Sequence, residues 1–234
     1  MAKLQRLQTL SIIIPTLDEA SHLPLLFADL NAWPYDCDLT IVDGGSKDLT
    51  ISIAQIQRVN IIESPKKSRG YQLKIGASKA RGDWLLFLHA DSRLDPSWAN
   101  SLLKIIRSKT SKDSVWYFDF KIKKYNLGFR LLEIAVGLRS QFFQRPYGDQ
   151  GLLIHKDLYA LSGGFSSLKI MEDLELITRI TKTKKAKRIG ENIYTDAKKW
   201  ANSNILLRAI KNAKLRKKWR EGYDIDRLSK EYYS

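Results

Sequence analysis

The sequence predicts an α/β protein built on a mostly parallel, doubly wound sheet with helices on both faces. Three observations support this fold class. Short apolar, β-branched runs recur in the first half of the chain, and the run at 10–15 ends at a proline. Segments with helical spacing, such as 20–30, separate these runs. Alternation of buried strands and helices at this length indicates βαβ units, whose strands are parallel.

The first half of the chain predicts four strands and three helices. The strands are expected at residues 10–15, 39–43, 59–62 and 84–88. The helices are expected over 20–30, from a cap at Ser46 or Asp48 through residue 54, and over 70–80. The last of these strands is apolar throughout and leads directly into His89-Ala90-Asp91.

The pattern changes after about residue 110. We expect a half-buried strand at 115–121, a helix over 127–143, a turn at 148–151 and a short strand at 152–154. Further helices are expected over 158–165, from 172 onward, and near 204–220 and 224–233. No interdomain linker is visible. We therefore expect one domain over 1–200, with halves at 1–110 and 111–200, followed by a basic helical extension over 201–234.

The bulk composition favours a cytoplasmic protein. With 234 residues and a hydrophobic fraction of 44%, the chain can bury a core of its own. No apolar run approaches the roughly 18 residues that a membrane span requires, and the first residues lack the pattern of a signal peptide. Cys37 is the only cysteine, which excludes an internal disulfide and fits a reducing compartment.

The net charge of +15 is concentrated toward the C-terminus. Between Arg179 and Arg220 there are fifteen lysines and arginines against two acids, whereas the preceding chain is nearly balanced. Such a segment suits an anionic partner, either lipid or nucleic acid, and a solvated helix face is an equally good interpretation. Because the charges alternate with apolar residues such as Leu215 and Trp219, a peripheral contact with the inner face of a membrane is one specific hypothesis.

Acidic motifs follow three of the predicted strands. They are Pro15-Thr16-Leu17-Asp18-Glu19, Asp43-Gly44-Gly45-Ser46 and His89-Ala90-Asp91. In open α/β sheets ligands bind beyond the carboxyl ends of the strands, so we expect these motifs to converge on one edge. A carboxylate at a strand end suits a metal ion, and a second acidic site such as Glu172-Asp173 suits proton abstraction. The sequence therefore predicts an enzyme that acts on a phosphorylated substrate.

These motifs, in this order, resemble the family 2 glycosyltransferases, which have a GT-A fold. Residues 11–20 and 41–48 resemble the first two strand–loop units of that family, and 81–91 resembles the strand with its metal-binding D-x-D element. Gly163-Gly164-Phe165 followed by Met171-Glu172-Asp173 resembles its acceptor segment and catalytic E-D motif. The motifs at 88–91, 148–151 and 171–173 are most similar to a bacterial subgroup described as radical-SAM/selenodomain-associated transferases. The resemblance covers roughly residues 10–200.

The resemblance implies a nucleotide-sugar donor, with uridine as the default base, and a divalent cation, Mn²⁺ or Mg²⁺, at its diphosphate. Asp91 is the expected metal ligand; alternatively, it caps the turn that follows. His89 replaces the first carboxylate of D-x-D and is either a second ligand, a phosphate contact or an ordinary strand-end residue. The other residues expected at the donor are Pro15, Thr16, Asp18, Glu19, Asp43, Gly44, Gly45, Arg69, Gln72 and Ala90.

The resemblance also implies inverting transfer, with Asp173 as general base and Glu172 orienting the acceptor or Asp173 itself. Taken alone, the two acids also fit an ordinary helix N-terminus. On the acceptor side we expect Gly148, Asp149 and Gln150. Lys199-Trp200 stands where related enzymes carry an Arg-Trp pair near the diphosphate, but lysine lacks bidentate phosphate recognition, so its role is open. The acceptor is not identified, although a lipid-linked one would suit the basic C-terminus.

Three other function classes are compatible with parts of the chain. A nucleotidyltransferase would carry a glycine-rich basic loop directly after the first strand, where this chain has residues 15–19. A nucleic-acid-binding protein would use the +15 charge, with aromatic side chains such as Trp219 on the same surface. A GT-A protein that has lost catalysis would account for His89. The full order of motifs favours the active glycosyltransferase.

Overall fold

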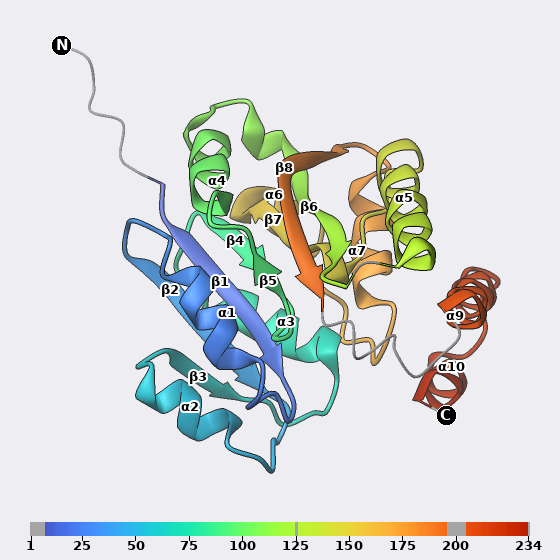
Figure 1. Ribbon diagram of the computed structural model, residues 1–234, viewed down its shortest axis with the longest axis horizontal. Coiled ribbons are helices and arrows are strands. Elements are labelled where there is room, and N and C mark those ends of the chain that lie inside the picture. Colours follow the sequence, from blue (N-terminus) through green and yellow to red (C-terminus); the bar gives the residue numbers. More distant parts are fainter. Residues whose placement is uncertain (1–7, 125, 196–204, 234) are drawn as a thin grey trace.

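The computed structural model describes residues 8–124, 126–195 and 205–233, with the backbone alone at 205–209 and 233. A single eight-stranded sheet runs through the molecule in the order β3-β2-β1-β4-β7-β6-β8-β5 (Figure 1). Helices cover both of its faces, which confirms the predicted α/β class. Within the described ranges, no helix is long and apolar enough to cross a membrane.

The parallel half of the sheet consists of four strands, all of which were predicted. They are β1 (Leu10–Thr16), β2 (Cys37–Asp43), β3 (Asn60–Glu63) and β4 (Trp84–Phe87). β1 pairs in parallel with both β2 and β4, and β2 pairs in parallel with β3. Thr16 and Asp43 are register partners at the carboxyl ends of β1 and β2. The loops that follow these two strands therefore begin side by side.

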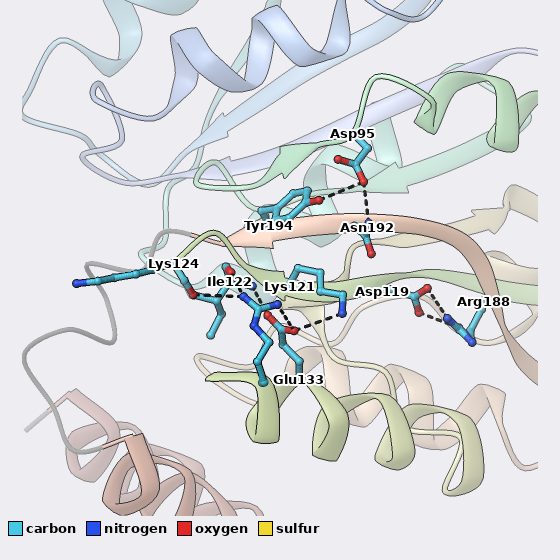
Figure 2. A network of polar contacts seen from close by, with 10 residues as sticks. Asp95, Asp119, Lys121, Ile122, Lys124, Glu133, Arg188, Asn192 and Tyr194 are labelled. Atoms are coloured by element: carbon cyan, nitrogen blue, oxygen red, sulfur yellow. Dashed lines mark hydrogen bonds and ion pairs between the residues drawn. The ribbon is translucent and has the colours of Figure 1, made fainter. Parts of the chain in front are cut away.

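The other half of the sheet is mixed. β7 (Leu152–His155) runs antiparallel to β4 and to β6 (Ser114–Ile122), β8 (Lys185–Thr195) is parallel to β6, and β5 (Arg93–Leu94) is antiparallel to β8. Neither β5 nor β8 was predicted. Polar contacts hold β8 in place: Arg188 pairs with Asp119 on β6, and Asn192 and Tyr194 both donate to Asp95 (Figure 2).

The helices form two layers around the sheet. One layer contains α1 (Leu23–Leu30), α2 (Thr50–Ile56) and α4 (Trp98–Arg107), and α4 was not predicted. The other contains α3 (Arg69–Lys79), α6 (Lys156–Leu161) and α7 (Glu172–Ile180). Successive side chains of a strand point to opposite faces, so Ile12 packs in the first layer and Ile13 in the second. Two short 3₁₀ turns, η1 (Ser111–Asp113) and η2 (Gly148–Gln150), complete this part.

Three helices gather at one end of the molecule (Figure 1). They are α5 (Leu127–Phe142), α9 (Ile205–Arg220) and α10 (Ile225–Tyr233), which correspond to the predicted helices. Leu215 of α9 and Leu228 of α10 are buried against Ile170. The C-terminal helices therefore pack on the segment that leads into the acidic pair at the start of α7.

Candidate active site

The loops after β1 and β2 are joined by hydrogen bonds around Asp43. Its carboxylate is 3% exposed and accepts from Thr16 Oγ1 at 3.0 Å and from the backbone N–H groups of Gly45 and Ser46, both at 2.8 Å. The Gly44 N–H in turn donates to the Thr16 carbonyl at 2.8 Å. Gly45 has a φ of 92°, which favours glycine. Asp43 thus organises the loop through its own carboxylate.

The acidic residues after β1 form contacts within this edge of the sheet. Asp18 N–H donates to Ser46 Oγ at 2.8 Å, and Asp18 Oδ1 accepts from Lys47 N–H at 2.7 Å. Glu19 Oε2 lies 2.7 Å from His22 Nδ1. The motifs after β1 and β2 therefore converge as predicted from the strand order.

Two predicted donor-site residues are buried at the base of the loops. Pro15 lies within β1 itself, and Ala90 packs in the core with α1 and α4. Neither side chain reaches a surface. Gln72, also buried, donates from Nε2 to the carbonyls of Thr16 at 2.9 Å and Val42 at 2.7 Å, so its amide supports the loop from beneath.

Arg69 at the start of α3 forms an ion pair with the buried Glu172 at the start of α7. Arg69 Nε donates to Glu172 Oε1, and the Glu172 side chain is 1% exposed. Burial opposes the charge of Arg69, but the attraction of Glu172 and Asp173 outweighs it and raises the pKa of the guanidinium. Burial also raises the pKa of Glu172, and Arg69 opposes that shift. Because a guanidinium stays protonated in proteins, we treat the pair as ionised.

A cavity of about 410 Å³ opens beside this ion pair. Its wall is formed by residues of α3, β6, η2, α7, β8, α9 and α10, together with the segments after β4 and before η2 and α7. They are Arg69, His89, Asp91, Phe120, Tyr147, Asp149, Ile170, Met171, Asp173, Leu174, Thr195, Asn212, Arg216 and Tyr232. The cavity therefore brings together carboxylates from distant parts of the sequence with two arginines.

Asp173 is held in this cavity by backbone hydrogen bonds. Its Oδ2 accepts from Gly148 N–H at 2.6 Å, and its Oδ1 accepts from Leu174 N–H at 2.7 Å. A Cβ atom at position 148 would lie 2.8 Å from His89 Nε2 and 3.2 Å from Asp173 Oδ2. Glycine at position 148 therefore lets this backbone approach both side chains without a shift of either.

Asp149 is a second carboxylate on the cavity wall. Its Oδ1 is inaccessible to solvent and has no hydrogen-bond partner among the described residues. Burial raises the pKa of Asp149, the Arg139 guanidinium opposes this shift, and the Asp173 carboxylate adds to it.

Asp91 lies just beyond β4 and is 7% exposed. Its Oδ2 accepts from Thr195 Oγ1 at 3.0 Å, which orients the carboxylate from β8. In the described part of the chain, no group of three or more His, Cys, Asp or Glu side chains is arranged to hold a metal ion. One carboxylate and one imidazole on a cavity wall instead fit a cation that takes its other ligands from a diphosphate.

Residues 11–162 match the sequence profile of glycosyl transferase family 2. The chain belongs to this family. A PGL/p-HBAD biosynthesis glycosyltransferase of Mycobacterium bovis is 41% identical over 163 residues, which cover 67% of this chain and 62% of that protein. An uncharacterized glycosyltransferase of Haemophilus influenzae is 24% identical over 181 residues, covering 73% and 61%. The chain thus spans about three fifths of the length of these curated relatives.

Solved glycosyltransferases share the GT-A fold of this family 2 chain. S. aureus TarS 1–349 in complex with UDP-GlcNAc has a TM-score of 0.63 and 15% identity, covering 80% of this chain and 58% of that one. The mannosyltransferase PcManGT from Pyrobaculum calidifontis, in complex with GDP-Man and Mn²⁺, has a TM-score of 0.61 and 16% identity, covering 79% and 56%. At these identities the likeness shows the fold, which confirms the predicted GT-A class.

Within this family 2 domain, β1, β2, their loops and Ala90 do not line the cavity, and the remaining predicted site residues separate into two groups. One group lines or adjoins the cavity: Arg69, His89, Asp91, Gly148, Asp149 and Asp173. In the other group, Gln72, Gln150 and Glu172 make buried contacts within the protein. The Gln150 amide accepts from Ser140 Oγ at 2.7 Å and donates to the Phe118 carbonyl at 3.2 Å. Lys199 and Trp200 lie outside the described residues.

The sequence analysis missed the cavity residues supplied by the C-terminal helices. Arg216 of α9 and Arg139 of α5 both lie over the ring of Tyr147, with guanidinium carbons 5.2 Å and 3.7 Å from its centroid. In the sequence, Arg216 is one member of a long basic run, and its spacing does not distinguish it from the other cations. Only the packing of α9 assigns it to the site.

Proposed function

We propose that this protein is a glycosyltransferase that moves a sugar from a nucleoside-diphosphate donor, with UDP as the expected carrier, to an acceptor hydroxyl. The observation that carries this proposal is the single cavity that Asp91 and Asp173 both line. Family 2 membership supports the reaction class, and the donor complexes of TarS and PcManGT support a nucleotide-sugar. The three motifs at 88–91, 148–151 and 171–173 support a place in the radical-SAM/selenodomain-associated subgroup.

We assign the role of general base to Asp173. The two backbone hydrogen bonds fix the position of its carboxylate. It takes the proton of the acceptor hydroxyl as that oxygen attacks the anomeric carbon opposite the diphosphate, which inverts the anomeric configuration. Asp149, which lines the same cavity, is the expected partner for another acceptor hydroxyl. Glu172 is a positioning residue, because its ion pair with Arg69 holds the start of α7.

Asp91 is the proposed protein ligand of a divalent cation, Mn²⁺ or Mg²⁺, with His89 as a second ligand or phosphate contact. When bound, such a cation stabilises the negative charge of the departing diphosphate. Arg216 is in position to add positive charge on the same cavity wall, and a guanidinium suits phosphate oxygens. The loops around Thr16, Asp18 and Asp43 would then enclose the nucleoside.

The chain organisation follows from these roles. We propose that residues 1–110 bind the donor, residues 111–200 bind the acceptor, and the extension over 201–234 completes the cavity wall. The acceptor is expected to be lipid-linked, with the enzyme acting in the cytoplasm at the inner face of a membrane. The basic C-terminal helices support this placement, because cations favour an anionic lipid surface.

Asp173→Asn tests the proposed reaction, since it keeps the shape of the side chain and removes its charge. We expect release of UDP from a UDP-sugar, in the presence of a lipid-extract acceptor, to fall by roughly 10²–10⁴-fold. Thermal stabilisation by UDP and Mn²⁺ should be retained. Asp157→Asn is the matched control, because that carboxylate is 74% exposed on α6.

Three results separate the possible roles. Normal turnover by Asp173→Asn would exclude Asp173 as the base. Equal loss of turnover and of UDP binding would make Asp173 structural. Loss of turnover alone, with an active Asp157→Asn control, supports the proposal.

A further inference from the structure

The exposed face of α5 is apolar along its whole length. Five of its large hydrophobic side chains are between 49% and 71% exposed: Leu127, Leu131, Ile134, Leu138 and Phe142. The other exposed residues of this helix are Ala135, Gly137 and Gln141, so its exposed face carries no charge. Phe143, which follows the helix, is also 69% exposed. A continuous apolar surface of this kind marks an interaction site in a folded protein.

Charged side chains hold the opposite face of α5 against the sheet. Glu133 is buried and accepts from the Ile122 N–H at 2.8 Å, from Arg130 at 2.7 Å and from Lys121 at 3.3 Å (Figure 2). Ser140, also on this face, donates to Gln150 at 2.7 Å. Turning the apolar face inward would break this network and leave a buried carboxylate unpaired, which is costly. The outward orientation of the apolar face is therefore built into the fold.

The neighbouring helix α9 presents cations instead. Lys211, Lys214, Lys217 and Arg220 are exposed along it. The sequence suggested that the apolar side of α9 itself meets a membrane. In the structure, Leu215 is buried against Ile170 and Leu228, and Trp219 packs beside them, whereas Ile210 is 42% exposed. This part of the apolar side of α9 is thus occupied by the protein, and the four cations remain in solvent.

The two helices that carry the apolar and cationic surfaces are neighbours beside the cavity. α5 and α9 lie at the same end of the molecule (Figure 1), and both contact the cavity residue Tyr147, through Arg139 and Arg216. An apolar surface next to a group of cations is the arrangement that binds in the interface of an anionic bilayer.

We propose that the exposed face of α5 inserts into the surface of an anionic membrane while the cations of α9 contact lipid phosphates. This docking would place the cavity next to the lipid surface. It does not depend on the proposed glycosyl transfer, although a lipid-linked acceptor would benefit from it. A bilayer fits better than a second copy of the chain, because two copies that each carry a charge of +15 repel one another, whereas an anionic surface attracts the cations of α9.

The test is co-sedimentation of the full chain with vesicles of phosphatidylcholine alone or with one third phosphatidylglycerol. The α5 variant is L131Q/I134Q/L138Q. Its control is L49Q/I56Q/L161Q, which changes three hydrophobic residues elsewhere that are even more exposed. The charge variant is K211Q/K214Q/K217Q, and its control, K74Q/K79Q/K109Q, removes three exposed lysines from α3 and the segment after α4.

We expect wild type and both controls to bind the anionic vesicles, and the α5 and charge variants to bind about tenfold more weakly or worse. All five proteins are expected to melt at similar temperatures, because each altered side chain is exposed. Vesicle binding by the α5 variant at the wild-type level would overturn the proposal. The proposal would also be overturned if wild type were a dimer, the α5 variant were a monomer, and both bound vesicles equally. That result would identify α5 as a self-association face.

Discussion

Replacing Glu172 with glutamine tests whether an ion pair holds the start of α7. The Glu172 side chain is 1% exposed and accepts from Arg69, whose side chain is 36% exposed. Removing one partner of a fully buried ion pair costs about 3–5 kcal/mol, and losing a hydrogen bond to a charged group costs about 1.5–3 kcal/mol. Because water reaches Arg69 in the variant, the lower range applies, and we expect the free energy of unfolding to fall by about 2 kcal/mol.

Thermal unfolding without nucleotide measures this effect. For a chain of this size, 1 kcal/mol corresponds to about 2–4 °C, so the melting temperature of Glu172→Gln should fall by about 4–8 °C. Glu63→Gln is the control, because this carboxylate at the end of β3 is exposed and its loss should change stability by less than about 0.5 kcal/mol. A wild-type melting temperature for Glu172→Gln would refute the reasoning. An equal fall in both variants would assign the effect to net charge.

Two further substitutions probe the cavity carboxylates. Asp91→Asn should remove the Mn²⁺ dependence of UDP binding in calorimetric titrations with and without chelator, and unchanged metal-dependent binding would exclude Asp91 as a ligand. Burial raises the pKa of Asp149, so its contribution favours the folded state in acid and is lost as the pH rises through the folded-state pKa. Asp149→Asn should therefore match wild type in acid and melt at a higher temperature near neutral pH. A difference in melting temperature between Asp149→Asn and wild type that is the same at every pH would show that ionisation of Asp149 is not its cause.

The fold was predictable where burial leaves a pattern in the sequence. β1, β2 and β4 are buried on both faces, so they appear as short apolar runs between helices. α4 was not predicted, but the same pattern indicates it. Its buried residues include Trp98, Leu102 and Ile106, which have helical spacing. β8 is different. It is a polar strand held by contacts such as that of Arg188 with Asp119, and these partners are 69 residues apart.

The site was predictable at the ends of strands and less so beyond them. The order of parallel strands places Thr16 next to Asp43, and the motifs marked both residues. The direction of each side chain depends on tertiary packing, which placed Gln72 beneath the loops and Ala90 in the core. Arg216 shows the same limit, since a basic helix in the sequence does not reveal which of its cations faces the protein.

The segment 147–150 connects the proposed base to the proposed membrane surface. Gly148 donates to Asp173, Gln150 bonds to Ser140 on the inner face of α5, and Tyr147 lies against Arg216 of α9. These contacts all lie on the inner sides of the helices, whereas the apolar and cationic surfaces lie on their outer sides. Outer substitutions should therefore weaken membrane binding and leave the cavity intact. Inner substitutions should disturb the orientation of Asp173 even in the absence of lipid, so the two functions are separable by mutation.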